Sequence, residues 1–378
     1  MFLRIITGIL KRMLIGFLLV VVTLSVGTWI FLQQPKFGKY PSGDRLERIK
    51  KSPNYSDGKF RNLSVTPDLT EGSTYYSVMK EFIFSDRPRR KPVDSIPSTK
   101  TDLHALDLDQ NSLVWFGHSS YYLQIDGKRF LVDPVLSGAA SPVAATTRSF
   151  PGTDVYSPED IPSIDYLLIT HDHWDHLDYK TLIALRDRVS MVFCGLGVGA
   201  HLEQWGYDSD RIVELDWYDS AELDPGFSLH IRPARHFSGR GLLRNRSLWV
   251  SFVLEAPSTR LYLGGDSGFD NHFRSIGEEF GSFDLAILEN GQYDKSWKYI
   301  HLMPEEVILA STELRAKRLL AVHSSKFALG NHPWDEPLIR VSKLAAEENV
   351  KLITPMIGQA VNLRDSAQRF DHWWNGVQ

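Results

Sequence analysis

Histidine and aspartate are concentrated in the eight residues HDHWDHLD at 171–178, which hold three of each. Neutral imidazoles and carboxylates are the groups that bind a divalent ion such as Zn²⁺ in proteins, at about 2.0 to 2.2 Å. His171 and His173 stand two residues apart, so both can face one ion from a loop, whereas Asp175 and His176 come about one turn later and face a neighbouring position. This loop therefore predicts the start of two metal sites, with an ordinary solvated loop as the alternative.

Three further candidate ligands each stand at the end of an apolar run. His236 follows LHIRPAR, Asp266 ends RLYLGGD and His323 ends RLLAVH. Each alone has an ordinary structural explanation, but together with the loop they supply enough imidazoles and carboxylates for two ions. Cys194 is the single cysteine, which excludes a disulfide within the chain and a metal site built from several cysteines.

The elements that must bring these residues together alternate between strand-like and helix-like patterns. Apolar runs of strand length occupy 166–170, 191–194, 229–234, 248–255, 260–266, 283–290, 318–324 and 350–356. Helical patterns such as DYKTLIALRDR and MPEEVILASTELRA lie between several of them, and residues 121–134 alternate around Asp126-Gly127, which indicates a hairpin. The alternation predicts a layered α/β domain with sheets inside and helices outside, and a site just past the strand ends.

The order of the candidate ligands resembles that of the metallo-β-lactamase superfamily: H-x-H-x-D-H, then a distal histidine, a Gly-Asp at a strand end and a final histidine. Within it, the chain is similar to the branch of N-acylphosphatidylethanolamine-hydrolysing phospholipase D and its bacterial membrane-associated relatives. The motifs that carry this closer resemblance are WFGHSS (115–120), FLVDPVLSGAASPVA (130–144), THDHWDHLD (170–178), GGDSGFD (264–270), IHLMPEEV (300–307) and AVHSSKFALGNH (321–332). The resemblance implies an α/β fold of the αββα four-layer sandwich type.

The resemblance also implies a centre with two Zn²⁺ ions per chain. The positions that match the family's ligands are His171, His173 and His236 for one zinc, Asp175, His176 and His323 for the second, and Asp266 as the bridge. Two such ions, about 3.5 to 4 Å apart, hold a bridging hydroxide near neutral pH and clamp the oxygens of an ester under attack. Asp266 and Asp175 are on this interpretation catalytic as well as metal-binding.

Three residues are expected beside the ligands rather than among them. Asp133, which closes the run RFLVD, and Asp178 are candidates to hydrogen-bond the imidazoles and fix their orientation. For each of the two, a turn or helix N-cap is the alternative. His118 of GHSS resembles a family position near the site.

Other polar residues are candidates for catalysis or substrate binding. His301 of IHLMPEEV matches a pocket-facing histidine of the phospholipase branch and would protonate a leaving alkoxide or bind a phosphate oxygen, with helix capping as the alternative. Arg240 and Arg244 follow His236 closely, and guanidinium groups suit phosphate or carboxylate, unless they belong to a solvated loop. His332 of GNHPWDEP is a substrate-binding candidate with a structural role in its loop as the alternative.

The N-terminal part contains an uncharged stretch, MLIGFLLVVVTLSVGTWIFL at 13–32, which is about the length that crosses a bilayer as a helix. A cleaved signal peptide is the alternative, but the stretch is longer than a usual h-region and no A-x-A-like site follows it. Three Lys or Arg residues precede the stretch and six follow it closely, which favours a cytoplasmic globular part, although a basic start also suits export. We divide the chain into a membrane anchor (1–32), a linker and N-terminal extension (33–108) and a hydrolase domain (109–378).

The sequence thus predicts a membrane-anchored dinuclear zinc hydrolase that cleaves a phosphodiester, in the manner of a phospholipase D acting on N-acylphosphatidylethanolamine or a related lipid. A lactonase or other carboxylic ester hydrolase of the same fold is the nearest alternative, and a metal-stabilised envelope binding or structural protein is the alternative from another class. The formal net charge of -4 disfavours nucleic acid as a partner. The expected partners are a phospholipid or other ester substrate, the membrane and, as in many family members, a second copy in a homodimer.

Overall fold

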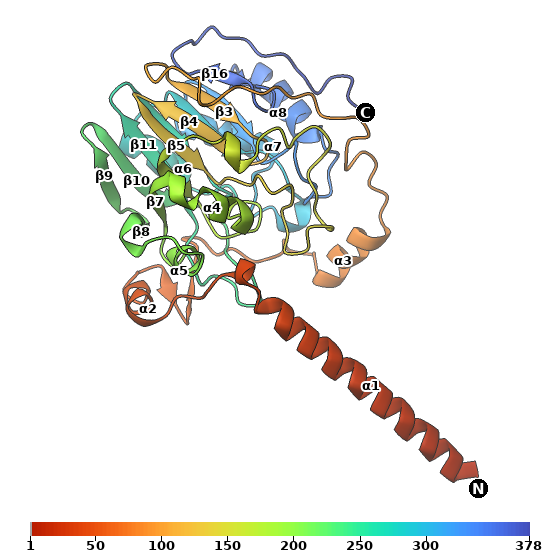
Figure 1. The fold of residues 1–378 in the computed structure, drawn as a ribbon. Helices are drawn as coiled ribbons and strands as arrows, with labels where there is room; N and C mark the ends of the chain where they lie inside the picture. Colours follow the sequence, from red (N-terminus) through yellow and green to blue (C-terminus); the bar gives the residue numbers. More distant parts are fainter. Residues whose placement is uncertain (1) are drawn as a thin grey trace.

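Two β-sheets packed face to face form the body of the protein in this computed structural model, which describes residues 2–378 (Figure 1). The first sheet has the strand order β16 (Ala360–Asn362), β3 (Ser112–Trp115), β4 (Tyr121–Ile125), β5 (Lys128–Val132), β6 (Ile164–Ile169), β7 (Val189–Gly195) and β8 (Ile212–Leu215). The second has the order β15 (Leu352–Ile353), β14 (Leu319–Val322), β13 (Leu285–Glu289), β12 (Thr259–Leu263), β11 (Val250–Ala256), β10 (Phe227–Pro233) and β9 (Ser220–Asp224).

Each sheet is parallel on one side and antiparallel on the other. Neighbours from β5 to β8 are parallel in the first sheet, as are those from β12 to β15 in the second, and the remaining pairs are antiparallel. The turn between β4 and β5 is the hairpin predicted from the sequence, with positive φ angles of 45° at Asp126 and 82° at Gly127. Since parallel neighbours share a direction, the loops that follow them leave the sheet at one edge.

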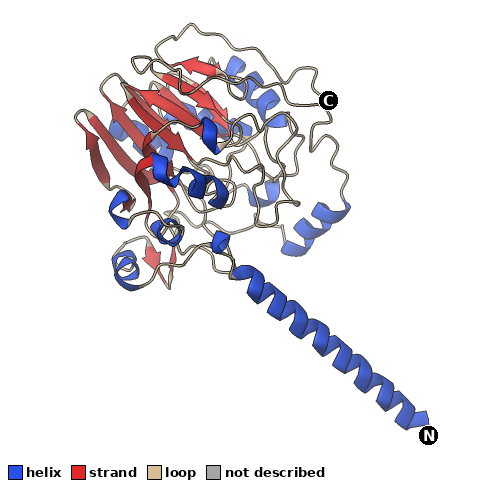
Figure 2. Cartoon of the chain, viewed as in Figure 1, coloured by secondary structure: helices blue, strands red, loops and turns tan. Residues whose placement is uncertain are grey.

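Helices cover the outer faces of both sheets (Figure 2). They are α4 (Tyr179–Leu185) and α5 (Gly199–Gln204) on the first sheet, and α6 (His272–Phe280), α7 (Pro304–Glu313) and α8 (Glu336–Glu347) on the second. Strand residues alternate between the two faces: in β6, Tyr166 and Leu168 join the core between the sheets, whereas Leu167 and Ile169 join the core under the helices. The predicted αββα sandwich is confirmed.

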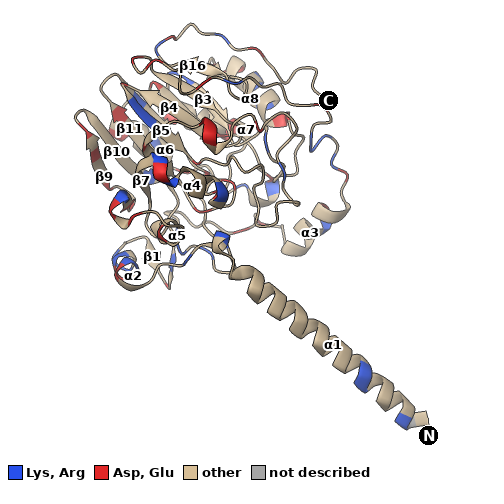
Figure 3. Cartoon of the chain, viewed as in Figure 1, with Lys and Arg blue, Asp and Glu red and all other residues tan. Residues whose placement is uncertain are grey.

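The N-terminal part lies outside these four layers. Helix α1 (Phe2–Leu32) projects from the body, and its Lys and Arg residues lie toward its N-terminal end (Figure 3). The stretch Arg4–Leu32 is long and apolar enough to cross a membrane, and it includes the predicted span at 13–32. Met1, which the predicted anchor includes, lies outside the described residues.

Short elements complete the structure. The extension after α1 carries α2 (Gly43–Ile49), the strand pair β1 (Tyr55–Ser56) and β2 (Lys59–Phe60), and α3 (Tyr75–Phe84). Turns of 3₁₀ helix occur at Pro35–Phe37, Pro158–Asp160, Arg186–Arg188, Ser209–Arg211 and Lys295–Trp297.

Candidate metal centre

Four strand ends meet at one edge of the sandwich and carry the candidate ligands. The loop 170–178 leaves β6, His236 follows β10, Asp266 follows β12 and His323 directly follows β14. Strands β10, β12 and β14 point the same way within the second sheet, because β10 and β12 are both antiparallel to β11 while β12 to β14 are parallel. The topology therefore brings these distant parts of the sequence to one place.

The first cluster consists of His171, His173, His236 and Asp266, whose nearest ligand atoms all lie within 4.8 Å of one another. His173 Nδ1 is 2.9 Å from His171 Nε2 and 3.2 Å from His236 Nε2. Asp266 Oδ2 is 3.7 Å from His236 Nε2 and 3.9 Å from His171 Nε2. Tetrahedral coordination of zinc at about 2.0 to 2.1 Å places neighbouring ligand atoms about 3.3 Å apart, which is close to these separations.

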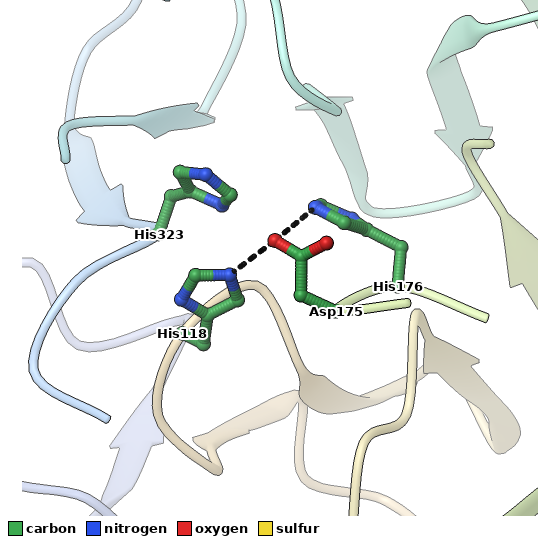
Figure 4. Close-up of side chains that lie close together, drawn as sticks. All are labelled: His118, Asp175, His176 and His323. Carbon is green, nitrogen blue, oxygen red and sulfur yellow. Dashed lines mark hydrogen bonds and ion pairs between the residues drawn. The ribbon is translucent and has the colours of Figure 1, made fainter. Parts of the chain in front are cut away.

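The second cluster consists of His118, Asp175, His176 and His323, and Figure 4 shows the adjacent Asp175 and His176 meeting His118 and His323, which come from other parts of the chain. Asp175 Oδ2 is 2.9 Å from His118 Nε2 and 3.6 Å from His176 Nε2. The structure thus brings Asp175, His176 and His323 together, and their role as ligands of a second ion stays a prediction. His118 lies beside them and contacts the Asp175 carboxylate, the kind of position expected for it.

Asp266 faces both clusters. Its Oδ1 is 3.1 Å from His176 Nε2 and 3.1 Å from His323 Nδ1 in the second cluster, while its Oδ2 points to the first. The Asp266 side chain is almost completely buried. A carboxylate placed between two groups of imidazoles has the geometry that two ions with a shared ligand require.

The chemistry of the two clusters fits a bound cation. His176 Nε2 and Asp266 Oδ1 are buried and have no hydrogen-bond partner among the described residues. An unpaired buried polar group costs about 1 to 3 kcal/mol, so a ligand that satisfies both of them is favoured. Burial holds the pKa of His171 and of His236 well below the usual value, which keeps these imidazoles in the neutral form that binds metals.

Asp133 stands behind the second cluster, as the sequence predicts. Its Oδ2 accepts a hydrogen bond from His176 Nδ1 at 2.8 Å, and its Oδ1 accepts from the Thr170 backbone N–H at 2.8 Å. A comparable contact holds the imidazole of His236, whose Nδ1 donates to the carbonyl oxygen of Ile300 at 2.8 Å. Contacts of this kind fix the orientation of a metal-binding imidazole.

A cavity of about 300 Å³ opens over both clusters. Arg244 and His301 line it, and the N-terminal extension contributes Asp68 and Tyr75 to its wall. Arg244 Nη1 is 3.1 Å from Asp68 Oδ2, and its guanidinium carbon lies 3.8 Å from the centre of the Phe237 ring. Arg244 and His301 are therefore placed where a bound substrate can reach them.

His301 pairs with a carboxylate that was not predicted from the sequence. His301 Nδ1 is 2.7 Å from Glu289 Oε2, and Glu289 Oε1 accepts from the backbone N–H groups of Ser267 at 2.7 Å and Leu302 at 3.2 Å. Burial raises the pKa of Glu289 well above its usual value and lowers that of His301. Glu289 ends the apolar run FDLAILE, just as Asp266 ends RLYLGGD. The same pattern in the sequence could therefore have identified Glu289 as a candidate site residue.

Asp178 has a different role from the one predicted. It is the N-cap of α4, where its Oδ1 accepts from the Lys180 backbone N–H at 3.3 Å. Its Oδ2 accepts from the Ser137 backbone N–H at 3.1 Å and from the Thr181 hydroxyl. The helix N-cap, considered as the alternative, is what the structure has, because the first N–H groups of a helix need an acceptor. The expectation that Asp178 orients an imidazole is corrected accordingly.

Arg240 was predicted from the sequence to bind substrate, and the structure gives it a different role. It is buried, and it donates to the carbonyl oxygens of Asp172 at 2.9 Å, Leu177 at 2.7 Å and Lys36 at 2.9 Å. Its guanidinium carbon lies 4.0 Å from the centre of the Trp174 ring. Arg240 therefore ties the metal-site loop to the segment that follows α1, and its donors are used by the backbone.

His332 likewise has a structural role in place of the predicted substrate contact. Its Nε2 accepts from the Gln292 backbone N–H at 2.8 Å, and its Nδ1 donates to the Pro333 carbonyl oxygen at 2.8 Å. The ring stacks on Tyr293 with the centroids 4.7 Å apart. Both ring nitrogens are engaged, so the loop-structural alternative is the one that the structure has.

Comparison with known proteins agrees with this architecture. Residues 128–324 match the family model described as "Beta-lactamase superfamily domain". An uncharacterized protein of Mycobacterium tuberculosis is 39% identical over 331 residues, which cover 86% of this chain and 88% of that protein. The N-acyl-phosphatidylethanolamine-hydrolyzing phospholipase D 1 of Caenorhabditis elegans is 30% identical over 315 residues, which cover 77% of this chain and 86% of that protein.

Solved structures share the fold. The structure of Igni18, a metallo hydrolase from the archaeon Ignicoccus hospitalis, superposes with a TM-score of 0.51 at 22% sequence identity and covers 67% of this chain and 97% of its own. The four layers, the His and Asp clusters and the match to the family model point to the same assignment. The chain belongs to the beta-lactamase superfamily, as a metal-dependent hydrolase related to the N-acyl-phosphatidylethanolamine-hydrolyzing phospholipases D.

Proposed function

We propose that this protein is a membrane-attached hydrolase that holds two zinc ions and cleaves a phosphodiester of the N-acylphosphatidylethanolamine type. The position of Asp266 carries the proposal: its Oδ1 is 3.1 Å from nitrogens of His176 and His323, and its Oδ2 is 3.7 Å from His236 Nε2. A buried carboxylate between two imidazole clusters suits a pair of ions. A salt bridge that served only to stabilise the fold would not need five histidines around Asp266.

The ions would be held by residues already grouped in the structure. The proposed ligands are His171, His173 and His236 for the first ion, Asp175, His176 and His323 for the second, and Asp266 for both. A site made of imidazole and carboxylate without sulfur suits zinc. When bound, two such ions supply Lewis acidity toward the substrate oxygens and a water that is nucleophilic near neutral pH.

The chain's own residues would bind the substrate and deliver the proton. Glu289 holds Nδ1 of His301, which leaves the other ring nitrogen of His301 for the leaving group. Hydrolysis would form a bond between the oxygen of water and phosphorus and break the bond between phosphorus and the departing alcohol oxygen. That oxygen would take a proton from His301, and the proton lost by the water would restore His301. Arg244, on the wall of the same cavity, suits the phosphate oxygens because its guanidinium offers paired donors.

The membrane attachment would be made by α1. A single-pass helix keeps the cavity close to the bilayer in which a diester lipid resides. The balance of Lys and Arg around α1 supports a cytoplasmic globular part. Homodimer formation, as in many family members, remains a further prediction.

Turnover of two substrates by the purified full-length protein in detergent micelles tests the proposal. We expect N-acylphosphatidylethanolamine to be hydrolysed, and a chelator, His171→Ala and Asp266→Ala each to abolish the reaction while the chain stays folded. Turnover of an acyl-homoserine lactone without turnover of the diester would assign the protein to the carboxylic ester hydrolases instead. If neither substrate reacted and the two variants only lowered the melting temperature, the metal site would be structural.

A further inference from the structure

Helix α3 lies exposed at the surface, and only Val78 among its residues is partly buried. None of its ten residues is buried, and Phe84, Tyr76, Ile83 and Met79 are 79%, 78%, 60% and 58% exposed. A helix of this length draws most of its stability from packing an apolar face against something else. A contiguous exposed apolar surface of this kind marks a site of interaction. Helix α3 therefore needs a partner that covers it.

A second exposed apolar segment lies at the base of α1. Leu242 is 78% exposed and its neighbour Leu243 is 47% exposed. Both line a hollow that is also lined by Leu32, the last residue of α1, and by Phe37. These two leucines thus lie beside the point where α1 leaves the body.

The candidate cavity lies between these two apolar segments. Arg244, which directly follows the leucines, has its Nη1 3.1 Å from Asp68 Oδ2. The same carboxylate oxygen accepts a hydrogen bond at 2.8 Å from the hydroxyl of Tyr75, the first residue of α3. Arg244, Asp68 and Tyr75 all line the cavity. The leucine segment, the cavity wall and α3 are therefore connected in this order.

Helix α3 lies on the side of the body from which α1 projects (Figure 1), and the two leucines lie beside the end of α1. Residues 80–91 also hold five Lys or Arg against two acidic residues, and Figure 3 shows basic residues in this part of the chain. Arg89 and Arg90 bond to the body, at Asp335 and at two backbone carbonyl oxygens, and the other three are Lys80, Arg87 and Lys91. One of them, Arg87, stacks over the Phe82 ring at 4.3 Å. Apolar side chains next to Lys and Arg are typical of a helix that lies at a bilayer surface, where its apolar residues enter the acyl boundary and its cations meet anionic headgroups.

We propose that α3 and Leu242–Leu243, together called the membrane rim, rest in the surface of the same bilayer that α1 crosses. The cavity then opens onto the leaflet and takes its lipid substrate from there. The inference rests on the proposed membrane attachment and adds a second contact with the bilayer. An anchor of one helix leaves the body free to rotate about the helix axis, whereas the rim sets the direction in which the cavity faces.

Fluorescence quenching from within the bilayer tests the membrane rim. Cys194 is buried, so a cysteine introduced at the surface is the one that reacts with a thiol dye. Ile83→Cys places the dye on α3, Leu24→Cys places it within α1, and Ile339→Cys, on α8 and 46% exposed, is the matched isoleucine control. Each full-length variant is labelled with an environment-sensitive dye and placed in nanodiscs that contain anionic lipid and nitroxide-labelled lipid.

We expect the dyes at positions 83 and 24 to be quenched and the dye at 339 to remain unquenched. A quenched dye at 24 with an unquenched dye at 83 would overturn the membrane rim and leave the anchor intact. An unquenched dye at 24 would overturn both. A dye at 83 that is shielded from water only at high protein concentration and without quenching would show that a second copy covers α3, and the rim would again be overturned.

Two acidic substitutions test whether the membrane rim gives the cavity access to lipid in a bilayer, separately from the hydrolysis step. Met79→Asp and Phe84→Asp lie on α3 outside the residues that line the cavity, and Ile339→Asp is the control. Since two large apolar groups are lost from the bilayer contact, hydrolysis of the diester in vesicles should fall about tenfold or more. Hydrolysis of a monomeric short-chain diester should be unchanged. Equal losses on both substrates, or no loss on vesicles, would overturn the rim; failure of the wild type on both would instead count against the proposed function.

Discussion

Asp133 accepts a hydrogen bond from Nδ1 of His176 at 2.8 Å, while Nε2 of the same ring is 3.1 Å from Asp266. One imidazole is thus fixed between a carboxylate at the back and the shared carboxylate at the front. Contacts behind a metal-binding imidazole commonly contribute a factor of about 10 to 100 in metal affinity. The hydrogen bond between Asp133 and His176 therefore links a residue outside the cavity to the proposed metal centre.

Replacing this rear carboxylate should weaken metal binding without unfolding the protein. Asp133→Asn keeps the shape but removes the charge, so we expect zinc affinity to fall by about 10- to 100-fold in a competition titration with a chelating dye. Asp165→Asn is the control, because Asp165 lies near the other end of β6 and accepts from the Arg129 backbone N–H. Equal affinities in all three proteins would contradict the role given to Asp133.

His301 and Glu289 should behave as one unit in catalysis. His301→Gln removes the proposed proton donor and should lower kcat by about 100-fold or more. Glu289→Gln should lower kcat less, because the imidazole remains. In the double variant the loss should match that of His301→Gln alone, since Glu289 acts through His301. Losses that multiply would mean that the two residues act independently.

Arg240 should stabilise the junction between α1 and the metal-site loop. Arg240→Ala leaves the carbonyl oxygens of Lys36, Asp172 and Leu177 without this donor, so unfolding free energy should fall by about 3 kcal/mol. Arg61→Ala, which removes an exposed pair with Asp57, should cost less than about 1 kcal/mol. Chemical denaturation in micelles measures both. Similar losses in the two variants would contradict the buried-junction account.

Lys326 makes a pH-dependent contribution to stability. It is buried, with its ammonium donating to the carbonyl oxygens of Phe116 and Val135, and burial lowers its pKa from 10.5 even though Asp154 opposes the shift. Between the lowered pKa and 10.5 the unfolded chain holds a proton that the folded chain has lost, so stability rises with pH across that window. The difference in unfolding free energy between wild type and Lys326→Met should therefore increase with pH there. A difference that stays constant or decreases would show that the pKa is not lowered.

The fold and most of the metal cluster were predictable because their signals are local. The apolar run at β6 followed by HDHWDHLD, and the acidic or histidine residue at the ends of the β12 and β14 runs, can be read without knowing which segments meet. Successive side chains of a strand such as β6 face two different cores, so a shift of one residue in register would move each buried side chain to the wrong core. The fixed register of these strands therefore also fixes where the residues at their ends lie, at the edge of the sandwich that carries the candidate ligands.

The remaining roles depend on distant contacts that composition does not reveal. Arg240 bonds the backbone of Lys36, which is 204 positions away, and His332 bonds Gln292, which is 40 positions away. Arg244, in the same motif as Arg240, lines the cavity instead. Two arginines in one loop therefore differ only in which neighbours the fold brings to them. The exposure of α3 is equally a property of the folded chain, since its sequence has the apolar content of a buried helix.

The central claim is that two ions share Asp266, and anomalous diffraction at the zinc edge tests it most directly. Crystals of the full-length protein, purified without added metal, should give two peaks per chain about 3.5 to 4 Å apart. One peak should lie among His171, His173 and His236, and the other among Asp175, His176 and His323, with Asp266 in contact with both. A single peak, or peaks away from Asp266, would contradict the account.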